Sequence, residues 1–319
     1  MMPYRDFAFR CLWKALGARG LSILLYHRVL PELVTMRPGE ITARGFEWQM
    51  SVLQEHFNVL SLRQALEYLE HGRLPPRSVC ITFDDGYADN LTVALPILER
   101  YGLTATVFVS SGFLSGGQMW NDSILEALRV IRPGSLDLSA LGLGKFNVAK
   151  DSDRLNTASG IIRGSKYLPL ARREEVVKHL MEVAGIQSQG LMLTHEGLRE
   201  LKRRGVEIGG HTVSHGILAS LAEDEARAEI EQGKADLEGI LGEPIDFFAY
   251  PNGRKAQDYR PVDVELVRDA GFTAAVTTNW GVSAPATSRF ELPRFTPWDR
   301  SRAKYLIRMA LNARKPIAY

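Results

Sequence analysis

Two patterns of apolar residues alternate along this chain, one typical of strands and one typical of helices. Short runs of apolar and β-branched residues are typical of buried strands, whereas apolar residues three and four positions apart are typical of helices. The predicted strands are 22–27, 78–83, 104–110, 206–210, 245–250, 272–278 and 289–295. The predicted helices are 46–57, 62–72, 90–102, 194–204, 220–242 and 262–271. Strands and helices therefore alternate over most of the chain.

This alternation predicts the fold class. Strands that alternate with helices favour a parallel sheet with the helices outside it. We predict an α/β fold built on a seven-stranded barrel, and an open doubly wound sheet is the alternative. Helix ends carry their own signals. Thr194 is a typical N-cap, and Ser220 with Glu223 forms a capping-box pattern that would open the helix ending at Gly242.

The alternation is interrupted once, after the third strand. Residues 111–192 form a long insertion with helical pieces at 122–131 and 171–184. An insertion of this length suggests a substrate-covering element or a small subdomain. We divide the chain into an N-terminal segment (1–21), a barrel (22–299) and a C-terminal helical tail (300–319).

The N-terminal segment has the pattern of an amphipathic helix. One face would hold apolar side chains, and the cationic ones would lie elsewhere: Phe7, Leu12, Trp13 and Leu16 against Arg10, Lys14 and Arg19. Such a helix packs against the domain or lies on a membrane surface. No run approaches the ~20 apolar residues of a spanning helix, and the segment is a poor secretory signal. We expect a cytoplasmic protein, with peripheral contact at the inner membrane as the alternative.

Composition is that of an ordinary globular enzyme. The 319 residues are 45% hydrophobic and 24% charged, which is ample for a large core. A net charge of +2 gives no argument for nucleic-acid binding. The basic pairs in helix-like segments, such as Arg172–Arg173, are expected to be solvated. Two cysteines imply no disulfide framework.

Polar residues that could take part in catalysis or metal binding lie where the predicted strands end. The set consists of His27, Asp84, Asp85, His211, Tyr250 to Asn252, Thr277 to Trp280, and Arg294 within the last strand. In α/β barrels the active site is built at the carboxyl ends of the strands. We therefore expect these residues to meet on one rim.

Two short strings, TFDDGY (82–87) and HTVSH (211–215), indicate a metal site. Two ionised carboxylates close together repel each other unless a cation lies between them or one is protonated. The spacing of His211 and His215 suits two imidazoles on one metal if the segment makes a helical turn. One carboxylate and two imidazoles leave a coordination position for water, as in catalytic sites. The pattern predicts metal-assisted hydrolysis.

The two strings resemble the first two motifs of the polysaccharide deacetylases (carbohydrate esterase family 4, the NodB-homology domain). The resemblance runs from about Ser22 to Phe295. It implies a distorted (β/α)7 barrel that removes N- or O-acetyl groups from glycans. By position, Asp84 resembles the general base, and Asp85, His211 and His215 resemble the ligands of one divalent ion. That ion is usually Zn²⁺, with Ni²⁺, Co²⁺ or Fe²⁺ as alternatives.

The chain departs from the family pattern in two places. The third motif reads roughly R-x-P-Y-G, but here it is AYPNG, so Ala249 stands where many members have Arg. Arg294 is our candidate replacement, to orient the base. The family's C-terminal general acid is missing because no histidine follows His215. His27 is the candidate substitute, since a subgroup similar to the biofilm poly-N-acetylglucosamine deacetylases looks circularly permuted and has this histidine at the N-terminus.

Further side chains are candidates for contact with the sugar: Tyr87, Trp120, Asp122, Tyr250, Pro251, Asn252 and Trp280. The backbone N–H of Asn252 can serve the oxyanion whatever the side chain. Aromatic rings such as Trp120 and Trp280 bind the apolar faces of sugars, and core tryptophans are equally common.

The resulting functional hypothesis is a metal-dependent N-deacetylase. Its substrate would be an acetylated amino sugar in a glycan or a lipid-linked saccharide of a cell-surface polysaccharide pathway. One alternative is an amidohydrolase that acts on a non-sugar C–N bond, of the imide or formamide type. The other is a non-catalytic glycan-binding relative, which would need to have lost the base or the metal ligands.

Overall fold

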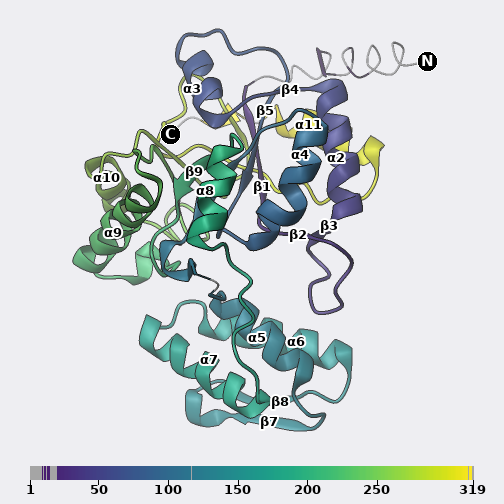
Figure 1. Cartoon of the computed structure of the whole chain (residues 1–319), viewed down its shortest axis with the longest axis vertical. Helices are drawn as coiled ribbons and strands as arrows, with labels where there is room; N and C mark the ends of the chain where they lie inside the picture. Colours follow the sequence, from purple (N-terminus) through teal and green to yellow (C-terminus); the bar gives the residue numbers. More distant parts are fainter. Residues whose placement is uncertain are drawn as a thin grey trace.

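A curled parallel sheet forms the centre of the computed structural model (Figure 1). The structure describes residues 20–115, 117–314 and 316–317, with residues 9, 11, 13 and 14 of the N-terminal segment. Within these residues the strand order is β1-β5-β6-β9-β10-β11, and β4 pairs with β5. The strands are β1 (Ser22–Tyr26), β4 (Asn58–Val59), β5 (Ser78–Phe83), β6 (Thr106–Val109), β9 (Glu207–Gly210), β10 (Phe247–Ala249) and β11 (Ala274–Val276).

The predicted last strand, 289–295, joins the two edges of this sheet. On the β11 side, Thr277 N donates to Leu292 O at 2.8 Å. On the β1 side, Leu25 N donates to Phe295 O at 3.0 Å. Because proline has no N–H to donate, Pro293 prevents a regular ladder here. The segment completes a distorted seven-stranded ring, so the predicted (β/α)7 barrel is confirmed and the open sheet is not.

Helices cover the outside of the barrel (Figure 1). They are α2 (Ala43–His56), α3 (Leu62–Glu70), the π-helical turn η1 (Asn90–Ala94) leading into α4 (Leu95–Arg100), α8 (His195–Arg203), α9 (Glu223–Leu241), α10 (Pro261–Asp269) and α11 (Arg302–Asn312). Short strands pair at the periphery: β2 (Val29–Leu30) with β3 (Ile41–Thr42), and β12 (Val282–Ser283) with β13 (Pro316–Ile317).

One predicted helix end is confirmed and one is wrong. Thr194 Oγ1 accepts the N–H of Gly197 at 3.0 Å, as an N-cap does. The capping box of Ser220 and Glu223 does not form. Ser220 is part of a 3₁₀ turn, η4 (Leu218–Ser220), so the N-cap is Ala222 and α9 begins at Glu223. There Glu225 accepts the N–H of Ala222 at 3.0 Å.

The insertion folds as a lobe beside the barrel (Figure 1). It holds η2 (Ser111–Phe113), α5 (Trp120–Val130), the hairpin β7 (Ser135–Leu138) and β8 (Gly144–Asn147) around η3 (Ser139–Leu141), α6 (Asp151–Ser165) and α7 (Leu170–Ala184). Its apolar side chains, including Ile124, Ile161 and Leu180, form a core cluster of their own. Sequence reasoning missed α6 because its small and polar residues give no clear helical period.

The described part of the N-terminal segment packs against the barrel. Phe9 and Trp13 are 4% and 6% exposed and contact Phe57, with ring centroids 5.5 and 5.7 Å apart. The other members of the predicted faces, Phe7, Arg10, Leu12, Leu16 and Arg19, lie outside the described residues. None of the helices in the described part of the chain has the length and apolarity that crossing a membrane requires.

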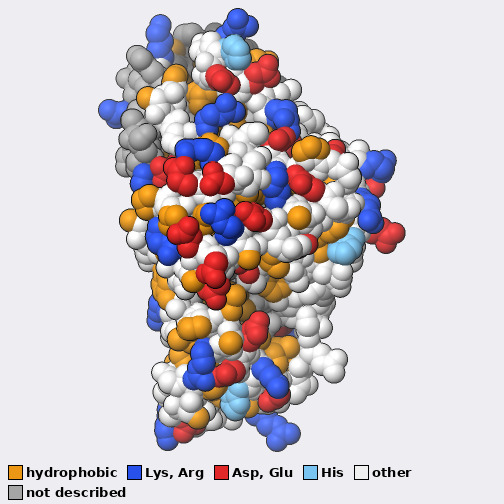
Figure 2. Space-filling view, turned by 90° about the vertical axis from the view of Figure 1, so that its left-hand side faces the viewer, with side chains coloured by type: hydrophobic (Ala, Val, Ile, Leu, Met, Phe, Trp, Pro, Cys, Tyr) orange, Lys and Arg blue, Asp and Glu red, His pale blue; other side chains and the backbone are white. Residues whose placement is uncertain are grey.

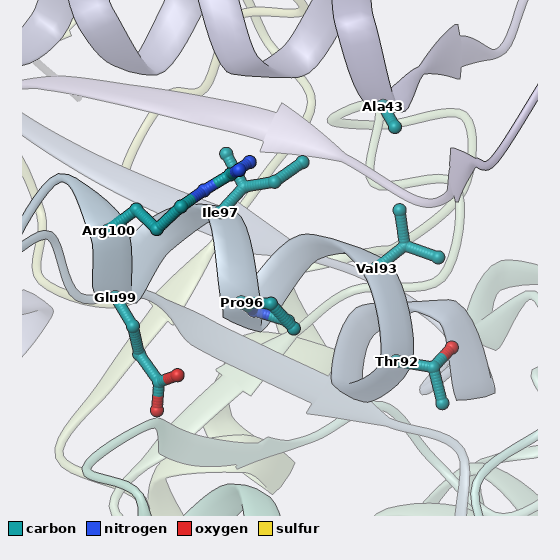
Figure 3. A pocket seen from close by; sticks show the side chains of 7 residues that line it. All are labelled: Ala43, Thr92, Val93, Pro96, Ile97, Glu99 and Arg100. Atoms are coloured by element: carbon teal, nitrogen blue, oxygen red, sulfur yellow. The ribbon is translucent and has the colours of Figure 1, made fainter.

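The outer surface carries acidic and basic side chains side by side (Figure 2). A hollow of about 620 Å³ lies between α2 and α4, lined by Ala43, Thr92, Val93, Pro96, Ile97, Glu99 and Arg100 (Figure 3). Its two charged side chains form ion pairs on the surface, Glu99 with Arg204 and Arg100 with Glu47. The hollow therefore offers no free acidic or basic group for catalysis.

The closing segment makes a prediction about stability. Leu292 is fully buried, so Leu292→Ala leaves a cavity and should lower the free energy of unfolding by about 2–5 kcal/mol. The control Leu33→Ala removes a side chain that is 71% exposed and should change it by no more than about 0.5 kcal/mol. Urea denaturation followed by circular dichroism measures both. Equal stabilities would contradict a core role for the segment.

Candidate metal and catalytic site

The polar residues at the strand ends meet on one rim, as predicted. They are His27 after β1, Asp84 and Asp85 after β5, His211 and His215 after β9, and Arg294 in the closing segment. Asp85 Oδ1 lies 3.5 Å from His211 Nε2 and 3.4 Å from His215 Nε2. Asp84 Oδ2 is 4.0 Å from His211 Nε2.

Asp85, His211 and His215 offer three ligand atoms within 4.8 Å of one another. Asp85 Oδ1 is buried and has no hydrogen-bond partner among the described residues. His211 Nδ1 lies 2.6 Å from Ala249 O, and donation to that carbonyl leaves the Nε2 lone pair free for a metal. A buried orphan carboxylate oxygen between two imidazoles fits a divalent cation.

The electrostatics of the two imidazoles agree with this fit. Burial lowers the pKa of His215 to about 3, so His215 is in the neutral form that ligates metals. Burial acts the same way on His211, but the carboxylates of Asp84 and Asp85 outweigh it and raise the pKa of His211. The cluster therefore attracts a positive charge, which a proton or a cation can supply.

Asp84 differs from the other three residues because its carboxylate is bound by Arg294. The guanidinium makes two 2.6 Å bonds, from Nη1 to Oδ1 and from Nη2 to Oδ2. Arg294 has no exposed surface, and its Nε also donates to Thr277 O at 3.0 Å. Burial alone would raise the pKa of Asp84, but Arg294 and His211 hold it below its ordinary value. Asp84 is therefore ionised at neutral pH.

The HTVSH segment does not make the helical turn that its spacing suggested. It is a loop in which Thr212 and His215 have φ values of +64° and +55°. Asp85 and Asn252 are also in the left-handed region, at +77° and +58°. Non-glycine residues are strained there, and such strain persists only where the surroundings hold it.

Helix α9 supplies that support. Glu229 accepts the N–H groups of Val213 and Ser214 at 2.9 and 2.8 Å, and the Ser214 hydroxyl at 2.7 Å. Gly233 lets the helix approach closely, because a Cβ at this position would lie 2.9 Å from the backbone of Thr212. Sequence reasoning missed Glu229. A glycine inside a helical pattern, which often marks close backbone approach, was the available signal.

His27 lies on the same rim, next to a cavity. The cavity has a volume of about 800 Å³ and is lined by His27, Glu40, Trp48 and Trp298 among others. The His27 carbonyl accepts a hydrogen bond from Asn90 Nδ2 at 2.9 Å, which fixes the backbone. The imidazole interacts electrostatically with both Asp84 and Asp85.

Four of the predicted sugar contacts are corrected by their burial. Tyr87, Asp122 and Tyr250 are at most 2% exposed, and Pro251 is buried as well. Tyr87 Oη donates to Asp122 Oδ2 at 2.7 Å, and Asp122 forms an ion pair with Arg37. Tyr250 stacks on a neighbouring tyrosine ring and donates to a backbone carbonyl. These side chains support the site from below.

The other predicted contacts keep exposed surface. Trp280 is 42% exposed and lies against Trp298, with ring centroids 4.9 Å apart. Trp120 and Asn252 are half-buried. The Trp120 ring is covered by Arg173, whose guanidinium carbon is 4.9 Å from the ring centroid. All three keep some exposed surface and stay candidates for contact with the sugar.

Comparison with known proteins identifies the family. The sequence model of the family described as "Polysaccharide deacetylase" matches residues 71–129 and 172–275, just over half of the chain. Both strings lie in the matched ranges, and the gap between the ranges falls inside the insertion.

Individual relatives agree with the family match. YxkH of Bacillus subtilis is 22% identical over 276 residues, covering 86% of this chain and 70% of YxkH. The poly-beta-1,6-N-acetyl-D-glucosamine N-deacetylase of Staphylococcus epidermidis is 25% identical over 209 residues, covering 58% of this chain and 70% of that enzyme. The structure of the Streptococcus pyogenes deacetylase PplD in complex with acetate superposes with a TM-score of 0.63 at 20% identity, covering 92% of this chain and 99% of PplD.

The fold, the Asp-His-His cluster and the family match lead to the same assignment, and they agree with the resemblance seen in the two strings. The chain belongs to the polysaccharide deacetylase family and is a hydrolytic deacetylase.

Proposed function

We propose that this protein removes the N-acetyl group from N-acetylglucosamine units of a cell-surface glycan, with poly-β-1,6-N-acetylglucosamine as the first substrate to test. The name of the Staphylococcus epidermidis relative supports this choice of sugar. The observation that carries the mechanism is the division between two neighbouring carboxylates. Asp85 Oδ1 is unpaired between two imidazoles, whereas both oxygens of Asp84 are bound by Arg294.

Asp85, His211 and His215 would hold one divalent ion. We choose Zn²⁺ as the first ion to test, because two imidazoles, one carboxylate and an open position form a catalytic zinc site. Such an ion polarises the acetyl carbonyl and lowers the pKa of a coordinated water. His211 Nδ1, bonded to Ala249 O, keeps the imidazole in the orientation and tautomer that this ligand set needs.

Asp84 acts as the general base. It is ionised, and a carboxylate has about four lone-pair sites, of which Arg294 uses two. The remaining sites can accept the proton of the attacking water. Arg294 comes from the closing segment and takes the place of the arginine that is absent at Ala249. The backbone N–H of Asn252, at the end of β10, would donate to the developing oxyanion.

His27 acts as the general acid that protonates the leaving amine. It lies on the rim between the carboxylates and the 800 Å³ cavity. A cavity of this volume accommodates a drug-sized ligand, which leaves room for sugars next to the deacetylated one. Trp48 and Trp298 in its wall offer aromatic surface for sugar rings.

The first test is acetyl release. Zinc-loaded protein is incubated with a β-1,6-linked N-acetylglucosamine oligosaccharide, and mass spectrometry should detect the loss of acetyl groups. Asp84→Asn should keep the bound zinc and slow turnover by about 10²–10⁴-fold, because the general base is lost. Asp137→Asn, on the exposed hairpin of the insertion, is the control. An Asp84→Asn protein with wild-type turnover would refute the base assignment.

A second prediction concerns the leaving group. His27→Ala should slow the hydrolysis of an acetamido sugar far more than that of an aryl acetate, because an aryloxide leaves without protonation. The ratio of the two values of kcat/KM measures this. His71→Ala, an exposed histidine at the end of α3, should leave the ratio unchanged. If His27→Ala slows both substrates equally, the acid is another group.

A third prediction concerns the support of His215. Glu229→Gln replaces a carboxylate that accepts three hydrogen bonds with an amide that has one acceptor oxygen. The loop should loosen, and zinc affinity should fall by about 10–100-fold. Competition with a chromogenic chelator measures the affinity. Glu231→Gln, exposed on the same helix, is the control. Unchanged affinity in Glu229→Gln would show that the loop holds His215 unaided.

A further inference from the structure

Arg173, on α7 of the insertion, is buried beside the candidate metal site. It is 5% exposed, contrary to the expectation that Arg172–Arg173 is a solvated pair. Its Nη2 lies 3.4 Å from Ser214 O, next to His215, and its guanidinium covers the Trp120 ring. Arg172 behaves as expected, since it is half-exposed and pairs with Glu175 on the surface.

Arg173 differs from the other buried arginines around the site in having no acidic partner. Arg28 pairs with Asp89, Arg37 with Asp122, and Arg294 with Asp84. Among the described residues, no carboxylate oxygen lies within 4.0 Å of the Arg173 guanidinium. Two acids act on Arg173 from a greater distance: the exposed Glu174, its neighbour in the sequence, and the half-buried Glu229. Glu229 already accepts three hydrogen bonds from the 213–214 loop.

The burial of an unpaired guanidinium is energetically unfavourable, which suggests that an anionic ligand binds to it. Removing a cation from water without a counter-charge is unfavourable, and burial lowers the pKa of Arg173 accordingly. A single 3.4 Å bond to a carbonyl uses one of the five N–H donors. A guanidinium that lies over an indole ring keeps N–H donors with which it can bind a carboxylate or phosphate through two parallel hydrogen bonds.

We propose that Arg173 and Trp120 form a subsite for an anionic group, a phosphate or a carboxylate, carried by the glycan close to the acetylated sugar. The inference rests on the proposed function and deepens it. A neutral N-acetylglucosamine polymer leaves Arg173 without a partner, whereas a phosphorylated or carboxylated saccharide provides one. The insertion then serves to select charged substrates, because it supplies both residues.

Binding measurements test the subsite without requiring turnover. Calorimetry with the zinc-loaded full chain compares N-acetylglucosamine 6-phosphate, N-acetylmuramic acid and neutral N-acetylglucosamine. At least one anionic sugar should bind tenfold or more tightly than the neutral one, and which one does so distinguishes phosphate from carboxylate. Arg173→Gln should abolish the preference, and Arg172→Gln should retain it. Because all three proteins carry zinc, binding of the anion to the metal alone would survive in Arg173→Gln.

Three outcomes would overturn the proposal. The first is a wild-type protein that shows no preference for an anionic sugar. The second is an Arg173→Gln protein that keeps the preference. The third is an Arg173→Gln protein that loses zinc and binds neutral and anionic sugars equally weakly. The last would mean that Arg173 only supports the loop of His215. The proposed function fails separately, if no acetyl group is released from any saccharide while the preference and its loss in Arg173→Gln are still observed.

Discussion

The ion pair between Asp84 and Arg294 joins the end of β5 to the segment that closes the barrel, and no surface of Arg294 is exposed. Removing one partner of a buried ion pair is strongly destabilising, so the closing segment and the ionised form of Asp84 stabilise each other. The pair also separates two adjacent carboxylates. With Asp84 bound to Arg294, Asp85 turns through a left-handed conformation and points its free oxygen between the two imidazoles. The two adjacent aspartates, Asp84 and Asp85, therefore have different environments.

The strain in the metal-site loops is tolerated because neighbouring elements hold it. Glu229 binds the peptide groups between the two histidines, and α9 approaches the same loop at Gly233. The loop after Asp85 is tied to the insertion. Tyr87 donates to Asp122, and the backbone of Leu193 donates to Gly86 O at 2.9 Å. The insertion is therefore a structural part of the site, and buried residues make the connection.

The insertion also changes how the basic residues are understood. Arg28 and Arg37 neutralise acids that lie behind the site, whereas Arg173 brings a charge to it without neutralising one. Proteins that share a fold can differ in such a residue, because function depends on the side chains of the site rather than on the fold.

The main strands and the polar groups at their carboxyl ends could be predicted from the amino-acid pattern alone. SVCITF matches β5 residue for residue, because a parallel strand buried on both faces is a continuous apolar run. Asp84 and Asp85 follow this run directly, and His211 follows β9, so their meeting at one end of the barrel was predictable. The pairing of Arg294 with Asp84 spans 210 residues and was expected only from the family pattern, as a replacement for the arginine missing at Ala249. The burial of Arg173, Tyr87 and Asp122 could not be predicted, because it depends on where the insertion packs. The loop at HTVSH likewise follows contacts with α9 rather than its helical spacing. Local periods record which face of an element is apolar, but contacts between distant elements leave no period in the sequence.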